Sequence, residues 1–377
     1  MGRLLMPQLL SFFYFFYFAI IGVYIIFLPK VLAMLGYSAS EIGIIFAAGP
    51  LVRFILPFAF TRGLKLNVKV FNTALVVMLL SSTAFYFSID NFYKLLFSNI
   101  GLGIGLSLVL PYIEVISLKT IGKERYGKIR LFGSVGFVLV ALVLVKFLSS
   151  AQIALLYLVV LAFLTAIVAF VIVRNSNEQN KEIAQVQNDI NLLSDYKLWI
   201  GLTLMQVSFG AFYNFFTIYE TDYGVSMDMT IYLWSFGVIA EIFMLFFQGK
   251  LLRGNLLLIL QITTFVTAIR WFLLFLFPQN MLVLFFAQTL HALSFALFHS
   301  AAISYLYNFY KHRSLAQQFF SGITYGLGGF LGALYAGYVY ELFPRYLFLS
   351  AAFIALMASW FLYLWSKKLA VNNQLSN

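Results

Sequence analysis

About twelve apolar runs follow one another along this chain, and each is close to the roughly 20 residues that an α-helix needs to cross a bilayer. The expected spans are 8–28, 41–61, 69–89, 93–117, 126–148, 152–173, 198–220, 229–249, 255–277, 281–307, 314–341 and 346–366. Hydrophobic residues make up 63% of the chain and charged residues 10%, which excludes a water-soluble enzyme, a disordered chain and a coiled coil. The short alternating strands of an outer-membrane barrel are absent from these runs. The sequence therefore predicts an all-α polytopic membrane protein with twelve transmembrane helices.

One long polar stretch divides the spans into two sets of six. Residues 174–197 are rich in Asn, Gln, Glu and Lys, and the segments on either side are nearly equal in length. We therefore expect two pseudo-symmetric six-helix bundles, formed by residues 1–173 and 198–377. Residues 174–197 are expected to be a cytoplasmic linker, and a short cytoplasmic tail is expected to end the second bundle.

The distribution of Lys and Arg predicts the orientation of the spans. Of the 24 Lys and Arg residues, 18 fall in or beside segments on the side of the amino terminus, and four fall on the opposite side. Because positive residues favour the cytoplasmic side, we expect both termini to be cytoplasmic, in a bacterial inner membrane. The first run has no A-x-A-like cleavage site and is expected to be a retained span. These basic loops leave binding of anionic lipid headgroups as a secondary hypothesis and give no support to nucleic-acid binding.

The chain contains no Cys, which excludes disulfides, thiolate metal sites and Cys nucleophiles. No metal or other cofactor is expected. An intramembrane hydrolase needs paired Asp, a metal–His site or a Ser–His pair, but Asp90, Asp222 and Asp228 fall in outer loops, and only Ser294 lies at helical spacing from His291. We therefore do not expect an enzyme. A receptor that transports nothing is a further alternative.

In the first half, three ionisable residues lie in spans where each costs about 2.5–3.5 kcal/mol unless it faces a cavity or a partner. These are Arg53, Glu114 and Arg130. The apolar stretch after Arg130 is too short to cross the bilayer, so we expect the helix to begin near Tyr126 and to include Arg130. Phe137 follows two turns later on nearly the same face. The candidate substrate-binding residues of this half are therefore Arg53, Glu114, Arg130 and Phe137. The structural alternative is that Glu114 and Arg130 form an ion pair that only holds two helices together.

In the second half, Glu241, Arg270 and His291 lie on three successive spans. A Glu that moves nearer to or further from an Arg can take up and release a proton, and a His can relay it. We expect Arg270 to bind substrate, and Glu241 and His291 to couple protons. A hydrogen-bonded core residue is the equal alternative for His291, and a structural role is favoured for His299.

The polar residues and the two halves together resemble the major facilitator superfamily, over essentially the whole chain. Within it, the stretch Tyr126–Phe137 (YGKIRLFGSVGF), with Pro111–Glu114 (PYIE) upstream, is most similar to the lactose permease-like and phenylpropionate permease-like proton symporters. In the second half, Ala240-Glu241, Ile269-Arg270-Trp271 and Leu290-His291 resemble the substrate and proton-coupling positions of that branch. Two departures stand out: the lactose permease has Trp in place of Phe137, and a proton-carrying Glu in place of Ser294.

The resemblance implies a monomeric secondary active transporter that works by alternating access, with its site at the bilayer midplane between the halves. We expect proton-coupled symport of a small organic solute. Since Arg53, Arg130 and Arg270 outnumber Glu114 and Glu241, an aromatic or other organic anion is favoured. The alternatives are a proton-coupled nucleoside or sugar symporter, and a proton-driven exporter of amphipathic compounds.

Overall fold

The computed structural model describes residues 2–64, 66–147, 151–176, 190–311 and 313–375. Residues 177–189 of the expected linker lie outside this described part. The chain divides into two compact units, Met1–Gln185 and Val186–Asn377, and the boundary between them falls inside the expected linker. The expected all-α fold is confirmed, because every regular element among the described residues is a helix.

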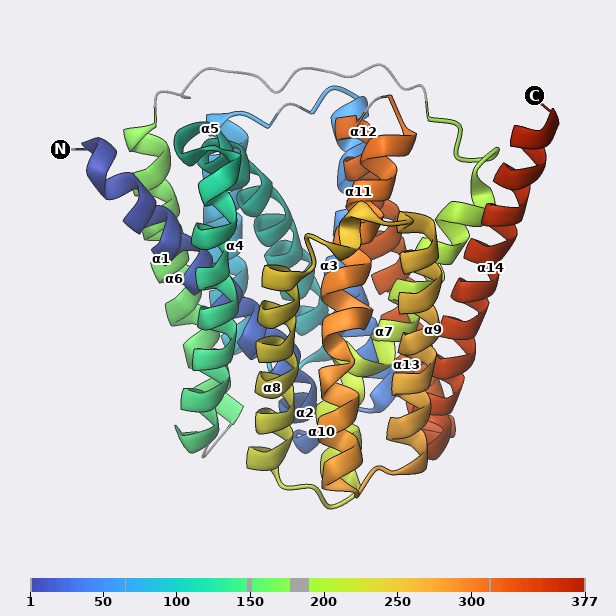
Figure 1. Ribbon diagram of the computed structural model, residues 1–377. Coiled ribbons are helices and arrows are strands. Elements are labelled where there is room, and N and C mark those ends of the chain that lie inside the picture. The colour runs from blue at the N-terminus through green and yellow to red at the C-terminus, as the bar shows by residue number, and fades with distance from the viewer. Residues whose placement is uncertain (1, 65, 148–150, 177–189, 312, 376–377) are drawn as a thin grey trace. The chain divides into compact units, whose positions relative to one another are not determined.

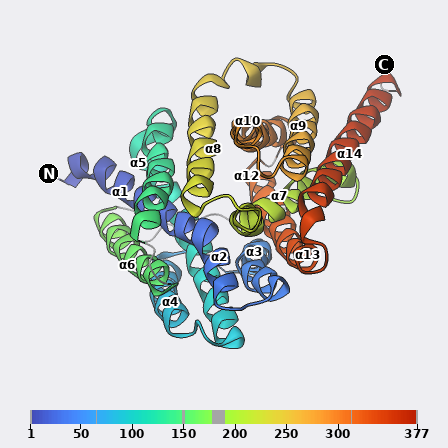
Figure 2. The same ribbon diagram turned by 90° about the horizontal axis from the view of Figure 1, so that it is seen from below.

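The first unit consists of six helical spans (Figure 1). They are α1 (Gly2–Gly22) continued by the π-helix η1 (Val23–Phe27) and α2 (Leu28–Met34), then α3 (Ala39–Thr61), α4 (Val68–Phe87), the two limbs of α5 (Phe92–Phe147), and α6 (Ala151–Asn175). α5 packs against α1, α3 and α4, and α4 also contacts α6. In the view of Figure 2, α4 and α6 lie side by side at one edge of this unit.

The two limbs of α5 meet at Gly122, whose φ of 73° and ψ of 163° are not helical. This backbone conformation is accessible essentially to Gly alone. The candidate spans on either side are Phe92–Gly122 and Arg125–Phe147. Arg130 therefore lies inside the second limb, as its sequence context predicts. The helix continues through Pro111 in the first limb.

The second unit also consists of six helical spans. They are α7 (Tyr196–Asp222); α8 (Met227–Phe247); α9 (Leu256–Leu276); α10 (Met281–Thr289) with the π-helix η3 (Ala292–Leu297) and α11 (Phe298–Phe309); α12 (Arg313–Phe319) with the π-helix η4 (Phe320–Leu327) and α13 (Gly328–Leu342); and α14 (Leu347–Leu375). The short 3-10 turns η2 (Leu251–Arg253) and η5 (Pro344–Tyr346) precede α9 and α14. Figure 1 shows α14, in red, running beside α9, with which it packs.

Side chains close the amino ends of several helices at the positions where the apolar runs begin. The hydroxyl of Ser38 and the carboxylate of Glu41 form a reciprocal capping box before α3. Asn67, Asn255 and Asn280 each accept a hydrogen bond from the backbone N–H three residues later. Because the first N–H groups of a helix have no partner inside it, such caps fix where each helix starts.

Eleven helical segments in the described part of the chain are long and apolar enough to cross a membrane. The remaining span, α7, has 27 residues but is not apolar enough to be counted with them. Most of its residues are buried, including Gln206, Ser208 and Thr217, so its surroundings are mainly protein. By contrast, α4 exposes Val76 and Leu80 at helical spacing, which suits contact with lipid.

Glycines allow helices of one unit to approach closely. A Cβ on Gly103 of α5 would lie 2.9 Å from the Cα of Gly49 in α3. In the second unit, a Cβ on Gly210 of α7 would overlap the backbone of Gly332 in α13. Gly103 and Gly332 therefore lie at close helix–helix contacts inside the first and the second unit, respectively.

Candidate functional site

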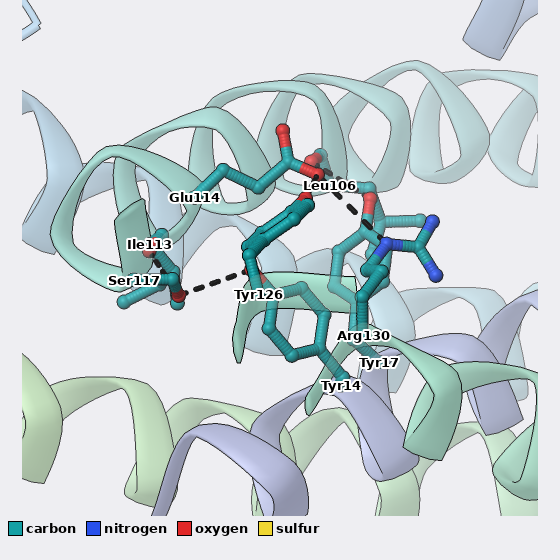
Figure 3. A network of polar contacts seen from close by, with 8 residues as sticks. All are labelled: Tyr14, Tyr17, Leu106, Ile113, Glu114, Ser117, Tyr126 and Arg130. Atoms are coloured by element: carbon teal, nitrogen blue, oxygen red, sulfur yellow. Dashed lines mark hydrogen bonds and ion pairs between the residues drawn. The ribbon is translucent and has the colours of Figure 1, made fainter. Parts of the chain in front are cut away.

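The hinge in α5 brings Glu114 and Arg130 together within the first unit (Figure 3). Arg130 Nε lies 3.9 Å from Glu114 Oε1, and both side chains are about one-third exposed. The hydroxyl of Tyr126 donates to the same carboxylate oxygen at 3.0 Å. The carboxylate therefore has two partners, and its side chain is only partly buried.

The Arg130 guanidinium also stacks on an aromatic ring of α1. Its Cζ lies 3.8 Å from the centre of the Phe18 ring and 5.5 Å from that of Tyr14. Gly133, one turn after Arg130, makes room, since a Cβ there would lie 2.6 Å from Phe18 Cδ2 and 2.9 Å from Arg130 Nη1. The sequence pattern placed Phe137 near Arg130 but did not identify Phe18.

Two tyrosines of α1 donate hydrogen bonds to the first limb of α5. Tyr14 donates to Ser117 Oγ at 3.0 Å, and Tyr17 donates to the Leu106 carbonyl at 3.0 Å (Figure 3). The helical carbonyl that Pro111 leaves without a backbone N–H donor is that of the next residue, Ser107. Both tyrosine rings are buried, so they hold the polar groups of α1 and α5 in register.

The other two predicted residues of this half lie around the pair. Arg53 of α3 is partly buried and is within range of a Coulombic interaction with Tyr17 and Glu114. Phe137 is also partly buried, and its backbone packs against Gly22, where a Cβ would lie 3.1 Å from the Phe137 carbonyl oxygen. The first unit therefore gathers Arg53, Glu114 and Arg130 into one electrostatic cluster.

In the second unit, Arg270 of α9 is completely buried. Its Nη2 donates to Gln288 Oε1 at 2.8 Å, and its Nη1 lies 2.9 Å from His291 Nδ1 and 3.2 Å from Ser294 Oγ. All three partners come from the segment where α10 gives way to η3. Gln288 lies in α10, His291 directly precedes η3, and Ser294 lies in η3, a π-helix, which is a distortion that is frequent at functional sites.

These contacts determine which nitrogen of His291 carries its hydrogen. A guanidinium only donates hydrogen bonds, so His291 Nδ1 must accept from Arg270 and the ring hydrogen must lie on Nε2. Nε2 in turn lies 3.7 Å from Glu241 Oε2 of α8. Arg270, His291 and Glu241 thus form a directed row in which the single N–H of the neutral imidazole faces the carboxyl group.

Aromatic rings surround this row. The Arg270 Cζ lies 4.3 Å from the centre of the Phe212 ring and 4.6 Å from that of Trp271. Phe295 stacks on His291 at 5.2 Å with an interplanar angle of 2°. The face of an aromatic ring attracts a cation, so these rings partly replace the water that the guanidinium lacks.

The charge of Arg270 has no carboxylate within ion-pair distance among the described residues. Its Nε and the Nε2 of Gln288 are buried donors without a hydrogen-bond partner in that part of the chain. A buried cation with neutral acceptors and unused donors is a site that an anionic group would complete.

Ser294 and His299 complete the description of this segment. Ser294, the position at which the resemblance places a Glu in the lactose permease, accepts a hydrogen bond from Arg270. His299 Nδ1 lies 2.6 Å from the Tyr325 hydroxyl of η4.

Sequence reasoning missed several side chains that the structure brings into these clusters. Gln288 lies one turn before His291, so a search for polar residues at helical spacing from His291 finds it. Phe18 contacts Arg130, but nothing distinguishes it from the other aromatic residues in its span. Tyr126 begins the stretch that carries the resemblance, but the sequence does not indicate its hydrogen bond to Glu114. Glu220 is the last residue of the expected span 198–220, and the structure buries it completely.

Comparison with known proteins supplies a family and relatives. Residues 8–370 match the model of the MFS_1 like family. The probable 3-phenylpropionic acid transporter of Escherichia coli (strain K12) is 25% identical over 379 residues, which cover 92% of this chain and 94% of that protein. The uncharacterized transporter YwbF of Bacillus subtilis (strain 168) is 25% identical over 321 residues, covering 81% of this chain and 79% of that protein.

Among solved structures, that of the nucleoside transporter NupG matches with a TM-score of 0.75 at 16% identity, covering 96% of this chain and 99% of that chain. At this identity the match shows a shared fold and nothing about the substrate.

Proposed function

This chain belongs to the MFS_1 like family and is a transporter of the major facilitator kind rather than an enzyme, and on that premise we propose that it is a proton-coupled symporter of a small organic anion. An aromatic carboxylate is the favoured substrate. The protein works by alternating access in a bacterial inner membrane, with both termini in the cytoplasm.

The observation that carries the proposal is the buried, uncompensated charge of Arg270. An isolated cation in a low-dielectric interior costs several kcal/mol, and a substrate carboxylate would offset that cost. Arg270 Nε and Gln288 Nε2 are available to bind its oxygens. The rings of Phe212 and Trp271, which line the guanidinium, suit a substrate that carries an aromatic ring.

The row of side chains beyond Arg270 supplies a route to proton coupling. A carboxylate that takes over Arg270 Nη1 displaces His291 Nδ1, which is then free to accept a proton. The resulting imidazolium is stabilised by Glu241, whose Oε2 lies 3.7 Å from His291 Nε2. Anion binding and proton binding therefore favour each other, and this linkage is reciprocal by thermodynamic necessity.

The first unit contributes a second group of charges to the proposal. Glu114 and Arg130 are each about one-third exposed, so a ligand can reach them. Arg53 adds positive potential near Glu114. We assign Arg53, Glu114, Arg130 and Phe137 to substrate binding. The name of the Escherichia coli relative, a probable transporter of an aromatic acid, supports the same substrate class.

The test is solute counterflow in membrane vesicles. The panel pairs aromatic and aliphatic carboxylates with uncharged amides of the same size and includes a neutral nucleoside and a sugar. The tolerance of expressing cells to amphipathic drugs is measured in parallel. We expect exchange of an aromatic carboxylate by the wild-type protein and its loss in Arg270→Gln. The matched control, Arg253→Gln, removes an exposed arginine and should leave exchange unchanged.

Three outcomes would contradict the proposal. They are an absence of carboxylate exchange across the panel, exchange of a neutral nucleoside or sugar that survives Arg270→Gln, and raised tolerance to amphipathic drugs without solute uptake. The second and third outcomes would instead favour the neutral-solute symporter and the exporter, respectively.

A further inference from the structure

The acid Glu220 lies one turn or less from the carboxyl end of α7 and takes no part in the two clusters described above. Its relative exposure is 0%. Neither of its carboxyl oxygens has a hydrogen-bond partner among the described residues. The carboxyl pairs with no cation there either, in contrast to Glu114 and Glu241, which face Arg130 and His291.

The burial of Glu220 does not arise from a frayed or irregular helix end. The N–H of Val225 donates to the Glu220 carbonyl, and Gly224 has a φ of 88°, which is the pattern of a Schellman closure. Val225 is itself buried. The backbone of α7 is therefore regular at this point, and Glu220, with 0% exposure, is not in contact with water in this structure.

A carboxyl group in this position is poorly placed as an anion. A carboxylate without a donor or a cation loses its hydration and receives nothing in exchange, whereas the neutral acid loses much less. Even the neutral acid has a hydroxyl group that donates no hydrogen bond, so a Leu or Met at this position would stabilise the packed helices more. A buried ionisable residue in a membrane span is, by default, a candidate functional site.

The titratable groups near this end of the second unit are few. Tyr219 interacts electrostatically with Glu220 and with Tyr223, whose ring centre lies 4.7 Å from its own. Tyr340 of α13 donates to the exposed Asp222 at 2.7 Å. Arg345 of η5 has a Coulombic interaction with Tyr219. None of these groups satisfies the Glu220 carboxyl.

We propose that Glu220 is a second proton-binding site of the transport cycle, separate from the His291–Glu241 row. It holds its proton in the conformation described here and gives it to water when a rearrangement hydrates the end of α7. The inference rests on the proposed proton-coupled function. It adds a proton to each cycle that the row alone does not account for.

The first experiment measures protonation directly. In the full-length protein in lipid nanodiscs near neutral pH, the infrared carbonyl band of a protonated carboxyl should be present in the wild type and reduced in Glu220→Gln. Asp228→Asn, which alters an exposed carboxylate at the start of the next helix, should leave the band unchanged. A band that is the same in the wild type and in Glu220→Gln would overturn the inference without any transport assay.

The second experiment measures coupling in proteoliposomes. Glu220→Gln keeps the size and neutrality of the protonated acid, so we expect counterflow close to that of the wild type. We expect a lower proton-to-substrate ratio when uptake is driven by a pH gradient. Glu220→Asp, which keeps a titratable group, should restore part of that ratio.

The two proposals fail in different ways in these experiments. If the wild type couples uptake to protons and Glu220→Gln has the same ratio, the role of Glu220 is wrong and the symporter remains. If a pH gradient does not drive uptake by the wild type, the symporter proposal is wrong, whatever the infrared band shows.

Discussion

At the scale of single residues, what distinguishes this protein is how the ionisable side chains inside its spans are compensated. Glu114 has a hydroxyl and a guanidinium as partners. Arg270 has only neutral acceptors and aromatic faces, and Glu220 has nothing among the described residues. A polar group that is fully satisfied rigidifies a structure, whereas an unsatisfied one stores free energy that another state can release. The unsatisfied groups are therefore where ligands and protons are expected to bind.

His291 provides the residue-scale prediction. In His291→Asn, the side-chain carbonyl can accept the Arg270 hydrogen bond, but the amide cannot take up a proton. We expect counterflow of the substrate to persist. Apparent substrate affinity should no longer rise as the pH falls, because position 291 then has no group that binds a proton.

The control for this prediction is His299→Asn, which alters a histidine bonded to Tyr325 instead of Arg270. It should retain the pH dependence of the wild type. A pH dependence that is unchanged in His291→Asn would show that the proton is bound elsewhere.

At the scale of elements, the sites depend on departures from regular helix. The kink at Gly122 lets one continuous segment present Glu114 and Arg130 to each other. The π-helix η3 follows His291 directly and contains Ser294, so that both side chains reach Arg270. Neither irregularity has a hydropathy signature, because an apolar run looks the same whether its helix is regular or distorted.

Two glycines of α5 give a matched prediction at this scale. In Gly122→Ala, the alanine must adopt a φ of 73°, which should destabilise the folded protein by about 1–3 kcal/mol. Relief of this strain should change the angle between the two limbs of α5 that carry Glu114 and Arg130. In Gly127→Ala, the new Cβ meets open space within the helix and should stabilise it by up to about 1 kcal/mol.

Thermal unfolding of the purified variants and substrate counterflow check this pair. We expect Gly122→Ala to lose both stability and transport, and Gly127→Ala to retain both. Equal behaviour of the two variants would mean that the hinge geometry does not position the ion pair.

At the scale of the whole molecule, each unit has its own buried core and its own polar cluster. In the first unit, aromatic residues of α1 pack on α5, and in the second, α7 packs on α13 and α14. The apolar faces that remain exposed, such as that of α4, suit lipid. The family match over residues 8–370 includes residues of both units.

The absence of Cys makes the predicted orientation easy to test at this scale. Single cysteines can be introduced at two exposed turn positions, Asp90 and Gly249, without any background labelling. In intact cells, a membrane-impermeant maleimide should label Asp90→Cys and leave Gly249→Cys unmodified. Reversed labelling would place the basic loops outside and contradict the orientation inferred from Lys and Arg.

The sequence alone was sufficient for the class of fold and the approximate position of each span. A helix in a membrane satisfies its own backbone hydrogen bonds, so the presence of a span depends on local hydropathy. The same local argument singled out Arg130 and Arg270, because a charge in an apolar run is costly wherever the run packs.

The tertiary structure decided which side chains meet. That Phe18 lies on Arg130, that Gln288 binds Arg270 and that Glu220 is left without a partner all depend on how each helix is rotated and what packs against it. These contacts join residues far apart in the chain, or depend on a kink or a π-turn that hydropathy does not record. Side-chain pairing is a property of packed helices, and hydropathy is a property of single ones.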